Sequence, residues 1–318
     1  MISNKEKNFI SAVVYVHNNE KKIGYFLENI NKELSNNFEK YEIICVNDKS
    51  IDKSVEEIKK VSDKISGTII SIINMSYYQG IELSMNAGID LAIGDFVYEF
   101  DNVYIDYDLD NVMKVYKEAL KGYDIVSAES NSKKRISSRI FYKIFNKNSS
   151  NMYQLHTETF RILSRRAINR VKSMNKTIPY RKAVYANCGL KLSVIYYKIV
   201  KSVKKLKLSK ETTSTRRDIA IDSIILFTDV SYKFAIIMAV MMMLLAIATG
   251  IYTIYIFICE QPIAGWTTTM LLLSFAFFGI FAILTIMIKY LSILIDLIFK
   301  KQKYLIESVE KIVKTTVY

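Results

Sequence analysis

Two long apolar stretches near the C-terminal end constrain this chain more than any other feature. They cover Phe234–Ile258 and Trp266–Ile288, and neither contains a charged residue. Because about 20 apolar residues are enough for a helix to cross a bilayer, each stretch predicts a transmembrane helix. The connector between them is too short to form a domain. We therefore expect a helical hairpin over residues 234–290.

Basic residues flank this hairpin on both outer sides and are absent from its connector. Lys and Arg concentrate in cytoplasmic segments, so both termini are predicted to face the cytoplasm. This indicates a multi-pass protein of the inner (cell) membrane, and the composition agrees, since 51% of the residues are hydrophobic although 24% are charged. The flanking residues are Arg216, Arg217 and Lys233 before the hairpin, and Lys289, Lys300, Lys301 and Lys303 after it.

The segments on either side of the hairpin predict further helices. Aliphatic and basic residues alternate over Leu190–Lys210, and Asp218–Val230 is apolar with acidic residues. Both patterns are typical of helices at a headgroup surface, which makes 191–233 a juxtamembrane region. Ordinary amphipathic helices that pack on the preceding domain are the alternative. Helical spacing over Leu291–Lys314 predicts a cytoplasmic tail helix within 291–318.

The net charge of +13 favours anionic partners such as a membrane surface or a nucleotide diphosphate. No nucleic-acid partner is expected, because no arginine run with interleaved aromatics and no zinc spacing is present. Cys45, Cys188 and Cys259 are too widely spaced to predict a disulfide framework, and they fit a reducing cytoplasm. The N-terminal apolar stretch is too short for a signal peptide, so export is not expected.

The first part of the chain, 1–190, predicts an α/β domain built on a doubly wound, mainly parallel sheet. Short β-branched runs alternate there with helical patterns, which is typical of such sheets. The predicted strands cover Ile10–Val16, Tyr41–Asn47, Gly67–Asn74, Asp95–Asp101 and Asp124–Ser127, and the predicted helices cover Lys21–Leu34, Asp52–Ser62, Gly80–Ile93 and Leu109–Leu120.

Polar residues stand where most of the predicted strands end. In an open parallel sheet, the ligand crevice lies outside the carboxyl ends of the strands. We therefore expect these polar residues to converge on one nucleotide-binding crevice. They are His17 and Asn18 after the first strand, Asn47 and Asp48 at the second, and Asp101 and Asn102 at the fourth.

Four stretches carry a family pattern, namely Val13–Glu20, Ile43–Ser54, Gln79–Asp95 and Glu158–Ala167. They resemble segments of the family 2 glycosyltransferases, which adopt the GT-A fold. Within that family the chain is similar to polyprenyl-phosphate sugar transferases, such as dolichol-phosphate mannose synthase and the bacterial undecaprenyl-phosphate glucosyltransferases. Those bacterial members also carry a C-terminal transmembrane hairpin, so the resemblance covers nearly the whole chain.

The resemblance implies a site for a UDP- or GDP-sugar at the strand ends. His17 stands where the family has an aromatic residue that stacks on the base, and Asp48 would accept hydrogen bonds from the base or ribose. An exposed turn histidine and a plain helix cap at Ser50 and Asp52 are the alternatives. The residues expected to bind the nucleotide sugar are His17, Asn18, Glu20, Asn47, Asp48, Ser50, Asp101 and Asn102.

The family's D-x-D metal motif falls on Asp101, Asn102 and Val103, so only its first carboxylate is present. The resemblance implies a divalent cation, Mg²⁺ or Mn²⁺, held by Asp101 together with the diphosphate and water. The basic pair that the family carries before the third stretch is replaced by Tyr77 and Tyr78. A second carboxylate could come from a downstream aspartate that would otherwise be a helix cap or a solvated charge, namely Asp106, Asp108 or Asp110.

Three basic residues are expected to bind donor or lipid phosphate, and they are Arg161, Arg165 and Lys210. Pairing with anionic lipid is the alternative for the arginines, and a juxtamembrane lysine needs no special role. Glu158 could act as a base, yet a polyprenyl phosphate is already an anionic nucleophile at neutral pH. The expected catalytic residues are Asp101, Glu158 and Arg161.

The sequence therefore predicts a membrane-anchored glycosyltransferase that moves a hexose from a nucleotide diphosphate sugar to a polyprenyl phosphate on the cytoplasmic leaflet. The alternative is a catalytically impaired, glycosyltransferase-like binding or scaffold subunit in envelope polysaccharide assembly. Val103 in the metal motif, Tyr15 in place of the family's proline and the lost basic pair favour that alternative. The sequence does not identify the sugar that is transferred, and it is compatible with a homo-oligomer.

Overall fold

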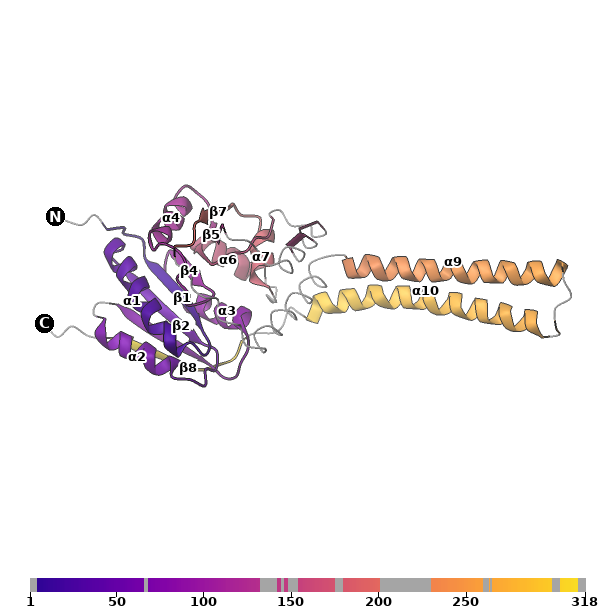
Figure 1. The fold of residues 1–318 in the computed structure, drawn as a ribbon, viewed down its shortest axis with the longest axis horizontal. Coiled ribbons are helices and arrows are strands. Elements are labelled where there is room, and N and C mark those ends of the chain that lie inside the picture. Colours follow the sequence, from indigo (N-terminus) through magenta and orange to yellow (C-terminus); the bar gives the residue numbers. More distant parts are fainter. Residues whose placement is uncertain are drawn as a thin grey trace. The chain divides into compact units, whose positions relative to one another are not determined.

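The computed structural model describes residues 5–65, 68–131, 142–143, 146–147, 154–174, 180–200, 230–259, 263, 265–298 and 304–313. The chain forms two compact units (Figure 1). The first comprises Met1–Ala220 together with Lys301–Tyr318, and the second comprises Ile221–Lys300. The chain thus leaves the first unit once and returns to it with its last residues.

An eight-stranded mixed sheet lies at the centre of the first unit. Its strands are β1 (Ile10–Val16), β2 (Tyr41–Asn47), β3 (Ile69–Met75), β4 (Phe96–Phe100), β5 (Ile125–Ser130), β6 (Phe160–Ser164), β7 (Leu192–Tyr197) and β8 (Ile306–Val313), in the order β7-β5-β6-β4-β1-β2-β3-β8. Strands β4, β1, β2 and β3 are parallel, whereas β6 is antiparallel to both of its neighbours. The prediction of a mainly parallel sheet is confirmed.

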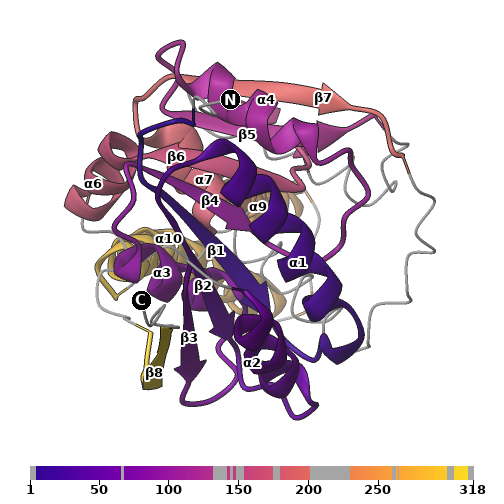
Figure 2. The same cartoon turned by 90° about the vertical axis from the view of Figure 1, so that its left-hand side faces the viewer.

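Helices cover both faces of this sheet. The described helices of the first unit are α1 (Glu20–Asn37), α2 (Ser54–Lys64), α3 (Ile81–Leu91), α4 (Asp110–Ala119), α6 (Arg165–Ser173) and α7 (Arg181–Asn187). Figure 2 shows α1 and α3 on opposite sides of β1 and β2. Apolar residues of α1, α2 and α4 form the main core with alternate strand residues. In α1 they recur three and four positions apart, at Ile23, Phe26, Leu27, Ile30 and Leu34.

Gly88 lets α3 lie close against the other face of the sheet. A Cβ atom at this position would stand 2.3 Å from Val13 Cγ1 and 2.7 Å from Val46 Cγ2. Both distances are far below van der Waals contact, so only glycine fits without a shift of helix or strand. The beginning of α3, which follows Gly80, is thereby fixed close to the ends of β1 and β2.

The last described residues form a strand, so the predicted tail helix within 291–318 is wrong for Ile306–Val313. This strand, β8, pairs antiparallel with β3, from Ile69 opposite Val313 to Met75 opposite Ile306. Apolar residues three apart in this segment suit a helix as well as a strand, but β-branched residues favour a strand. The open edge of β3 offers unpaired backbone groups, and β8 satisfies them.

The predicted helix over Leu190–Lys210 is wrong for its first part. Residues Leu192–Tyr197 form β7, which pairs parallel with β5 from Ile125 opposite Leu192 onward. The domain therefore continues beyond the expected boundary at residue 190. Residues 230–233 of the predicted juxtamembrane region form the beginning of the next helix, and 201–229 lie outside the described residues.

The second unit consists of two long helices joined by a short connector. They are α9 (Val230–Cys259) and α10 (Trp266–Ile298), and they run antiparallel (Figure 1). By length and composition, Ile236–Cys259 and Trp266–Ile288 could each cross a membrane. Few of their residues are buried, whereas a core helix of a soluble protein would be mostly buried. The hairpin expected over residues 234–290 is present.

Candidate active site

Parallel pairing brings the ends of β1, β2 and β4 to one edge of the sheet. Val16 lies opposite Asn47 in the register of β1 with β2, and Val14 lies opposite Phe100 in the register of β1 with β4. Neighbouring strands are about 4.8 Å apart, so the residues after these strands fall within roughly 10 Å across the sheet. We call this the strand-end edge. It contains His17, Asp48 and Asp101.

The loops after β1 and β2 bind to each other at this edge. The Nδ1 atom of His17 lies 2.7 Å from the carbonyl oxygen of Asp48, and the Asn18 N–H donates to Ser50 Oγ at 3.1 Å. The Ser50 N–H donates to Asn47 Oδ1 at 3.0 Å. Five of the residues predicted to bind the nucleotide sugar are therefore neighbours in the structure.

The carboxylates of Glu20 and Asp52 accept hydrogen bonds from backbone N–H groups near the starts of α1 and α2. The Glu20 N–H donates to Asp52 Oδ2 at 2.9 Å, and the Lys53 N–H donates to Glu20 Oε2 at 3.2 Å. Asp52 Oδ1 also accepts from the Ser54 N–H at 3.0 Å. Burial acts to raise the pKa of Asp52, but hydrogen bonds from Ser54 and Glu20 outweigh it and lower that pKa. The residue at the N-cap of α2 is Lys53, whose side chain makes no capping hydrogen bond, so the cap suggested for Ser50 is not found and Asp52 binds the helix start from one residue further out.

Asp48 is fully buried and fastens the loop after β3. Its carboxylate accepts hydrogen bonds from the Gln79 N–H at 2.8 Å, the Gly80 N–H at 2.9 Å and the Tyr15 hydroxyl at 2.9 Å. A carboxylate has about four acceptor positions, so at most one is left for a ligand. Burial, followed by the charge of Asp48, raises the pKa of Tyr15, which keeps this phenol a donor. Asp48 thus holds the loop after β3 in place at the strand-end edge.

Aromatic rings lie on the accessible side of the same edge. The rings of His17 and Tyr78 are 4.7 Å apart between centroids and tilted by 50°. Tyr78 is 39% exposed and its neighbour Tyr77 is 54% exposed. Stacking on a base needs an exposed ring face, which these residues offer. The sequence showed Tyr77 and Tyr78 only as a lost basic pair, because their proximity to His17 depends on the fold.

Asp101 belongs to a buried ion cluster. Its Oδ2 lies 2.9 Å from Arg161 Nη2 and its Oδ1 lies 2.8 Å from Arg181 Nη2. Glu99 joins the same two guanidinium groups, at 2.8 Å from Arg161 Nη1 and 3.0 Å from Arg181 Nη1. The cluster therefore ties β4 to β6 and α7.

Further carboxylates complete this cluster. Glu158 lies 2.8 Å from Arg161 Nε, and Glu82 of α3 lies 2.9 Å from Arg181 Nε. Each arginine is only 1% exposed, and buried charges are tolerated when they are paired in this way. Burial by itself raises the pKa of Asp101, but Arg181 and Arg161 outweigh it and hold that pKa well below its usual range.

The cluster changes the roles predicted for two residues. Arg161 faces Glu99, Asp101 and Glu158, so its donors are not free to clamp a phosphate. Glu158 is held by Arg161, which disfavours a role as general base. The sequence did not indicate that Glu82 or Arg181 takes part. Glu99 could have been found, because a charged residue inside an otherwise apolar strand implies a buried partner.

The residues at Asp101 do not fit the divalent cation implied by the family resemblance. Both oxygens of Asp101 face arginines, and Val103 is a buried apolar residue where the motif has its second carboxylate. Asn102 accepts a hydrogen bond from the Tyr104 N–H at 3.0 Å. Over the described part of the chain, no group of three or more His, Cys, Asp or Glu residues could hold a metal ion.

The aspartates downstream of the motif do not replace the missing ligand. Asp106 accepts a hydrogen bond from the Tyr197 hydroxyl at 2.9 Å. Asp108 accepts from the Asp110 N–H at 3.3 Å, at the start of α4. Only the Asp108 contact lies at a helix start, as the capping alternative predicts, whereas Asp106 is bound by a tyrosine.

Of the predicted phosphate-binding residues, Arg165 lies away from the strand-end edge. Ser164 pairs with Phe96 at the beginning of β4, so the following residue, Arg165, lies at the opposite edge of the sheet. There its side chain donates to the carbonyl oxygens of Gly94 and Ala92, each at 3.0 Å. Lys210 lies outside the described residues.

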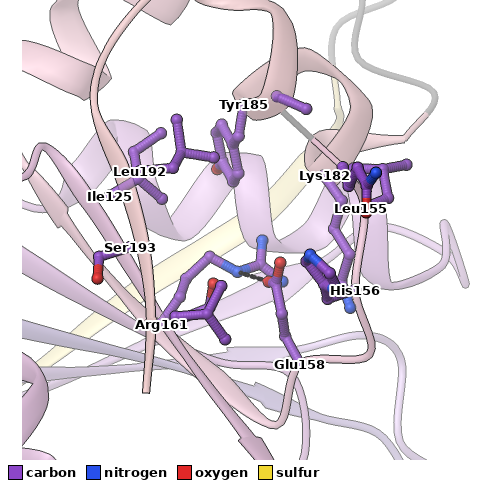
Figure 3. Close-up of a pocket in the computed structure, with 13 residues that line it drawn as sticks. Ile125, Leu155, His156, Glu158, Arg161, Lys182, Tyr185, Leu192 and Ser193 are labelled. Atoms are coloured by element: carbon purple, nitrogen blue, oxygen red, sulfur yellow. Dashed lines mark ion pairs between the residues drawn. The ribbon is translucent and has the colours of Figure 1, made fainter. Parts of the chain in front are cut away.

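A small cavity of about 130 Å³ lies between α7 and strands β5 and β7. Arg161 and Glu158 form part of its wall, and Figure 3 shows Tyr185 and Leu192 across the cavity from Glu158. His156 also lines it, with its Nδ1 3.8 Å from Glu129 Oε2. The cavity has no wall from His17 or Asp48, so it is separate from the predicted nucleotide crevice.

Several known proteins are similar to this chain in sequence. An uncharacterized glycosyltransferase of Synechocystis sp. is 28% identical over 59% of this chain, and the chain spans only 60% of that relative's length. The glycosyltransferase YkcC of Bacillus subtilis, also uncharacterized, is 23% identical over 85% of this chain and 84% of its own. A prophage bactoprenol glucosyl transferase homolog of Escherichia coli is 26% identical over 59% of this chain and 62% of its own.

One solved structure with distant similarity to this chain is also a sugar transferase by name. Glucosyl-3-phosphoglycerate synthase from Mycobacterium tuberculosis, in complex with Mn²⁺, UDP and glucosyl-3-phosphoglycerate, is 11% identical, with a TM-score of 0.48 over 68% of this chain and 79% of that one. The family model described as "Glycosyl transferase family 2" matches residues 11–178, which is more than half of the chain. The predicted α/β architecture on a mainly parallel sheet is confirmed, and the chain belongs to glycosyl transferase family 2.

Proposed function

We propose that this glycosyltransferase moves a hexose from a UDP- or GDP-sugar to a polyprenyl phosphate at the cytoplasmic face of a membrane. The observation that carries the proposal is the strand-end edge, where His17, Asp48 and Asp101 follow three adjacent parallel strands. In open α/β sheets this is where nucleotides bind. The bactoprenol glucosyl transferases among the relatives support the lipid acceptor.

The nucleoside would lie against the rings of His17 and Tyr78. Stacking suits any base, so these rings hold a uracil or a guanine without choosing between them. The loop that carries Gln79 and Gly80 is fixed by Asp48, which gives the nucleoside a rigid wall. Asp48 would therefore act chiefly through this loop.

The membrane acceptor is supported by the connectivity of the chain. The two helices α9 and α10 are long and apolar enough to cross a membrane. The chain enters them from the first unit and returns to that unit as β8. If both helices span, their outer ends lie on the same side as the α/β domain, where a polyprenyl phosphate headgroup would also lie. The surplus of basic residues on these flanks favours the cytoplasmic side.

The reaction would be an in-line displacement at the anomeric carbon. An oxygen of the lipid phosphate attacks that carbon, the bond to the nucleoside diphosphate breaks, and the configuration inverts. The attacking phosphate is already anionic, so Glu158 need not remove a proton. Because the residues around Asp101 do not fit a divalent cation, no step is assigned to one.

Sugar transfer to lipid tests this proposal. Purified full-length protein is incubated with radiolabelled UDP-glucose or GDP-mannose and polyprenyl phosphate in detergent, with Mn²⁺ or with EDTA. We expect label in the lipid fraction with one of these donors. Donor binding without any transfer, under both conditions and with a range of donor sugars, would instead favour the binding or scaffold subunit.

A further inference from the structure

Lys22, in the first turn of α1, carries an ammonium group with no conventional partner. Its Nζ atom is buried, and within the described part of the chain it makes no hydrogen bond. The described ion pairs do not include it either. Nζ lies 3.7 Å from the centroid of the Tyr104 ring. A ring face attracts the positive charge but gives no acceptor to three N–H donors.

The position of Lys22 places this charge at the strand-end edge. Phe26, one helical turn later, packs its ring 5.3 Å from that of Phe100, the last residue of β4. Helical side chains lean toward the N-terminus of their helix, so Lys22 reaches past Phe100 to the residues that follow it. The contact with Tyr104, three residues after Asp101, agrees with this direction.

The arginine cluster around Asp101 does not compete with Lys22 for an anionic ligand. In that cluster four carboxylates, Glu82, Glu99, Asp101 and Glu158, outnumber two guanidinium groups and the nearby ammonium of Lys182. The cluster therefore has an excess of negative charge and would not attract a further anion. A buried ammonium without an acceptor is unfavourable unless an anion binds to it. An anionic ligand at the site proposed for the donor would therefore bind to Lys22 and not to the arginine cluster.

We infer that Lys22 binds the diphosphate of the nucleotide sugar. Its positive charge would take the place of the divalent cation that the family resemblance implies. The inference rests on the proposed function, because it takes the ligand to be a nucleoside diphosphate. A phosphate oxygen would accept the N–H groups of Lys22, while the nucleoside lies toward His17 and Tyr78. Bound in this way, Lys22 would stabilise the charge that develops on the leaving diphosphate.

Calorimetry on the purified full-length protein tests this inference. UDP, GDP, uridine, guanosine and pyrophosphate are titrated in EDTA into the wild type, Lys22→Met and Lys21→Met. Methionine keeps the length and the apolar contact with Tyr104 but removes the charge, and Lys21 is an exposed neighbour on the same helix. We expect Lys22→Met to bind the diphosphates about 10-fold or more weakly, with nucleoside affinity and the Lys21→Met variant unchanged.

Thermal unfolding separates ligand binding from a structural role. If the Lys22 ammonium binds a ligand and has no structural role, Lys22→Met should unfold at the same or a higher temperature than the wild type, since a buried charge is removed. If Lys22 serves only to hold Tyr104, the variant should unfold at a lower temperature. That result, together with unchanged diphosphate affinity, would overturn the inference.

The outcomes also separate this inference from the proposed function. Sugar transfer by Lys22→Met with an unchanged KM for the donor would overturn the role of Lys22 and leave the transferase in place. A wild type that binds no nucleoside diphosphate would overturn both. Diphosphate binding that requires Mn²⁺ and is abolished by EDTA would show that Lys22 does not replace the cation.

Discussion

Arg181 Nη2 lies 2.8 Å from Asp101 Oδ1, and this ion pair joins α7 to the end of β4. Residues 80 positions apart thus meet where the family's metal motif would place its first ligand. The same arginine also reaches Glu99 and Glu82. The motif position is therefore part of the internal framework of the domain, and several consequences can be measured.

Removal of Arg181 should destabilise the α/β domain strongly. Arg181→Met leaves Glu82, Glu99 and Asp101 without one of their counter-charges, and breaking a buried pair in this way typically costs about 3–5 kcal/mol. Thermal and urea unfolding of the purified protein measure the loss. Arg166→Met is the control, because Arg166 pairs with Asp124 while 67% exposed. A similar loss in both variants would contradict the buried cluster as the cause.

The contribution of Asp101 to stability should disappear in acid. Its folded-state pKa is lowered, so it stabilises the fold above its unfolded pKa, near ~4, and this stabilisation is lost as pH falls toward the folded-state pKa. Wild type and Asp101→Asn should therefore differ by a constant free energy of unfolding above about pH 5. Below about pH 4 the difference should shrink. A difference that stays constant down to pH 3 would show that Asp101 does not ionise as described.

Gly88→Ala should destabilise the domain because α3 lies directly against β1 and β2. The added Cβ would stand 2.3 Å from Val13 Cγ1, and overpacking of this kind costs roughly 1–3 kcal/mol. Gly24→Ala is the matched control in α1. Its Cβ would meet nothing nearer than Val61 Cγ2 at 3.6 Å. Alanine there should be neutral or slightly stabilising, by up to about 1 kcal/mol. Chemical denaturation of the two variants checks the contrast.

The C-terminal strand should influence the loop at the strand-end edge. Gln79 Nε2 donates to the Leu305 carbonyl oxygen at 2.6 Å, and the Leu305 N–H donates to Gln79 Oε1 at 2.9 Å. We predict that Gln79→Ala increases hydrogen exchange in β8 and weakens nucleoside diphosphate binding several-fold, since the loop is held to Asp48 next to this contact.

Glu307→Gln is the control for this prediction. Glu307 lies in the same strand and pairs with Lys49, but both side chains are about half exposed, so this ion pair contributes little. Exchange in β8 should stay close to that of the wild type. If Gln79→Ala leaves both exchange and affinity unchanged, the strand and the loop are not coupled.

Much of the fold could be predicted from local pattern. The β-branched runs that form β1 and β2 have the same bounds in the sequence prediction and in the structure. Nearly all side chains of both strands are buried, so a continuous apolar run in the sequence directly indicates a strand inside the sheet. The segments of β7 and β8 could not be predicted, because their apolar spacing also suits a helix. Pairing of β7 with β5 and of β8 with β3 decided their conformation.

The site was predictable only in part. Polar residues after buried strands identified the strand-end edge, since parallel strands end together. The same residues did not reveal that Asp48 holds a loop, or that Asp101 and Arg161 neutralise each other. Arg181 and Lys22 gave no recognisable pattern, because their importance comes from burial and from partners distant in sequence.

The sequence by itself determined the family, the α/β domain and the two apolar helices, because motifs, strand periodicity and uncharged length are local properties of the chain. Only the tertiary structure decided which charges meet. An arginine turns a carboxylate from a metal ligand into half of an ion pair when the two lie within 3 Å, and that distance is set by packing between elements far apart in sequence.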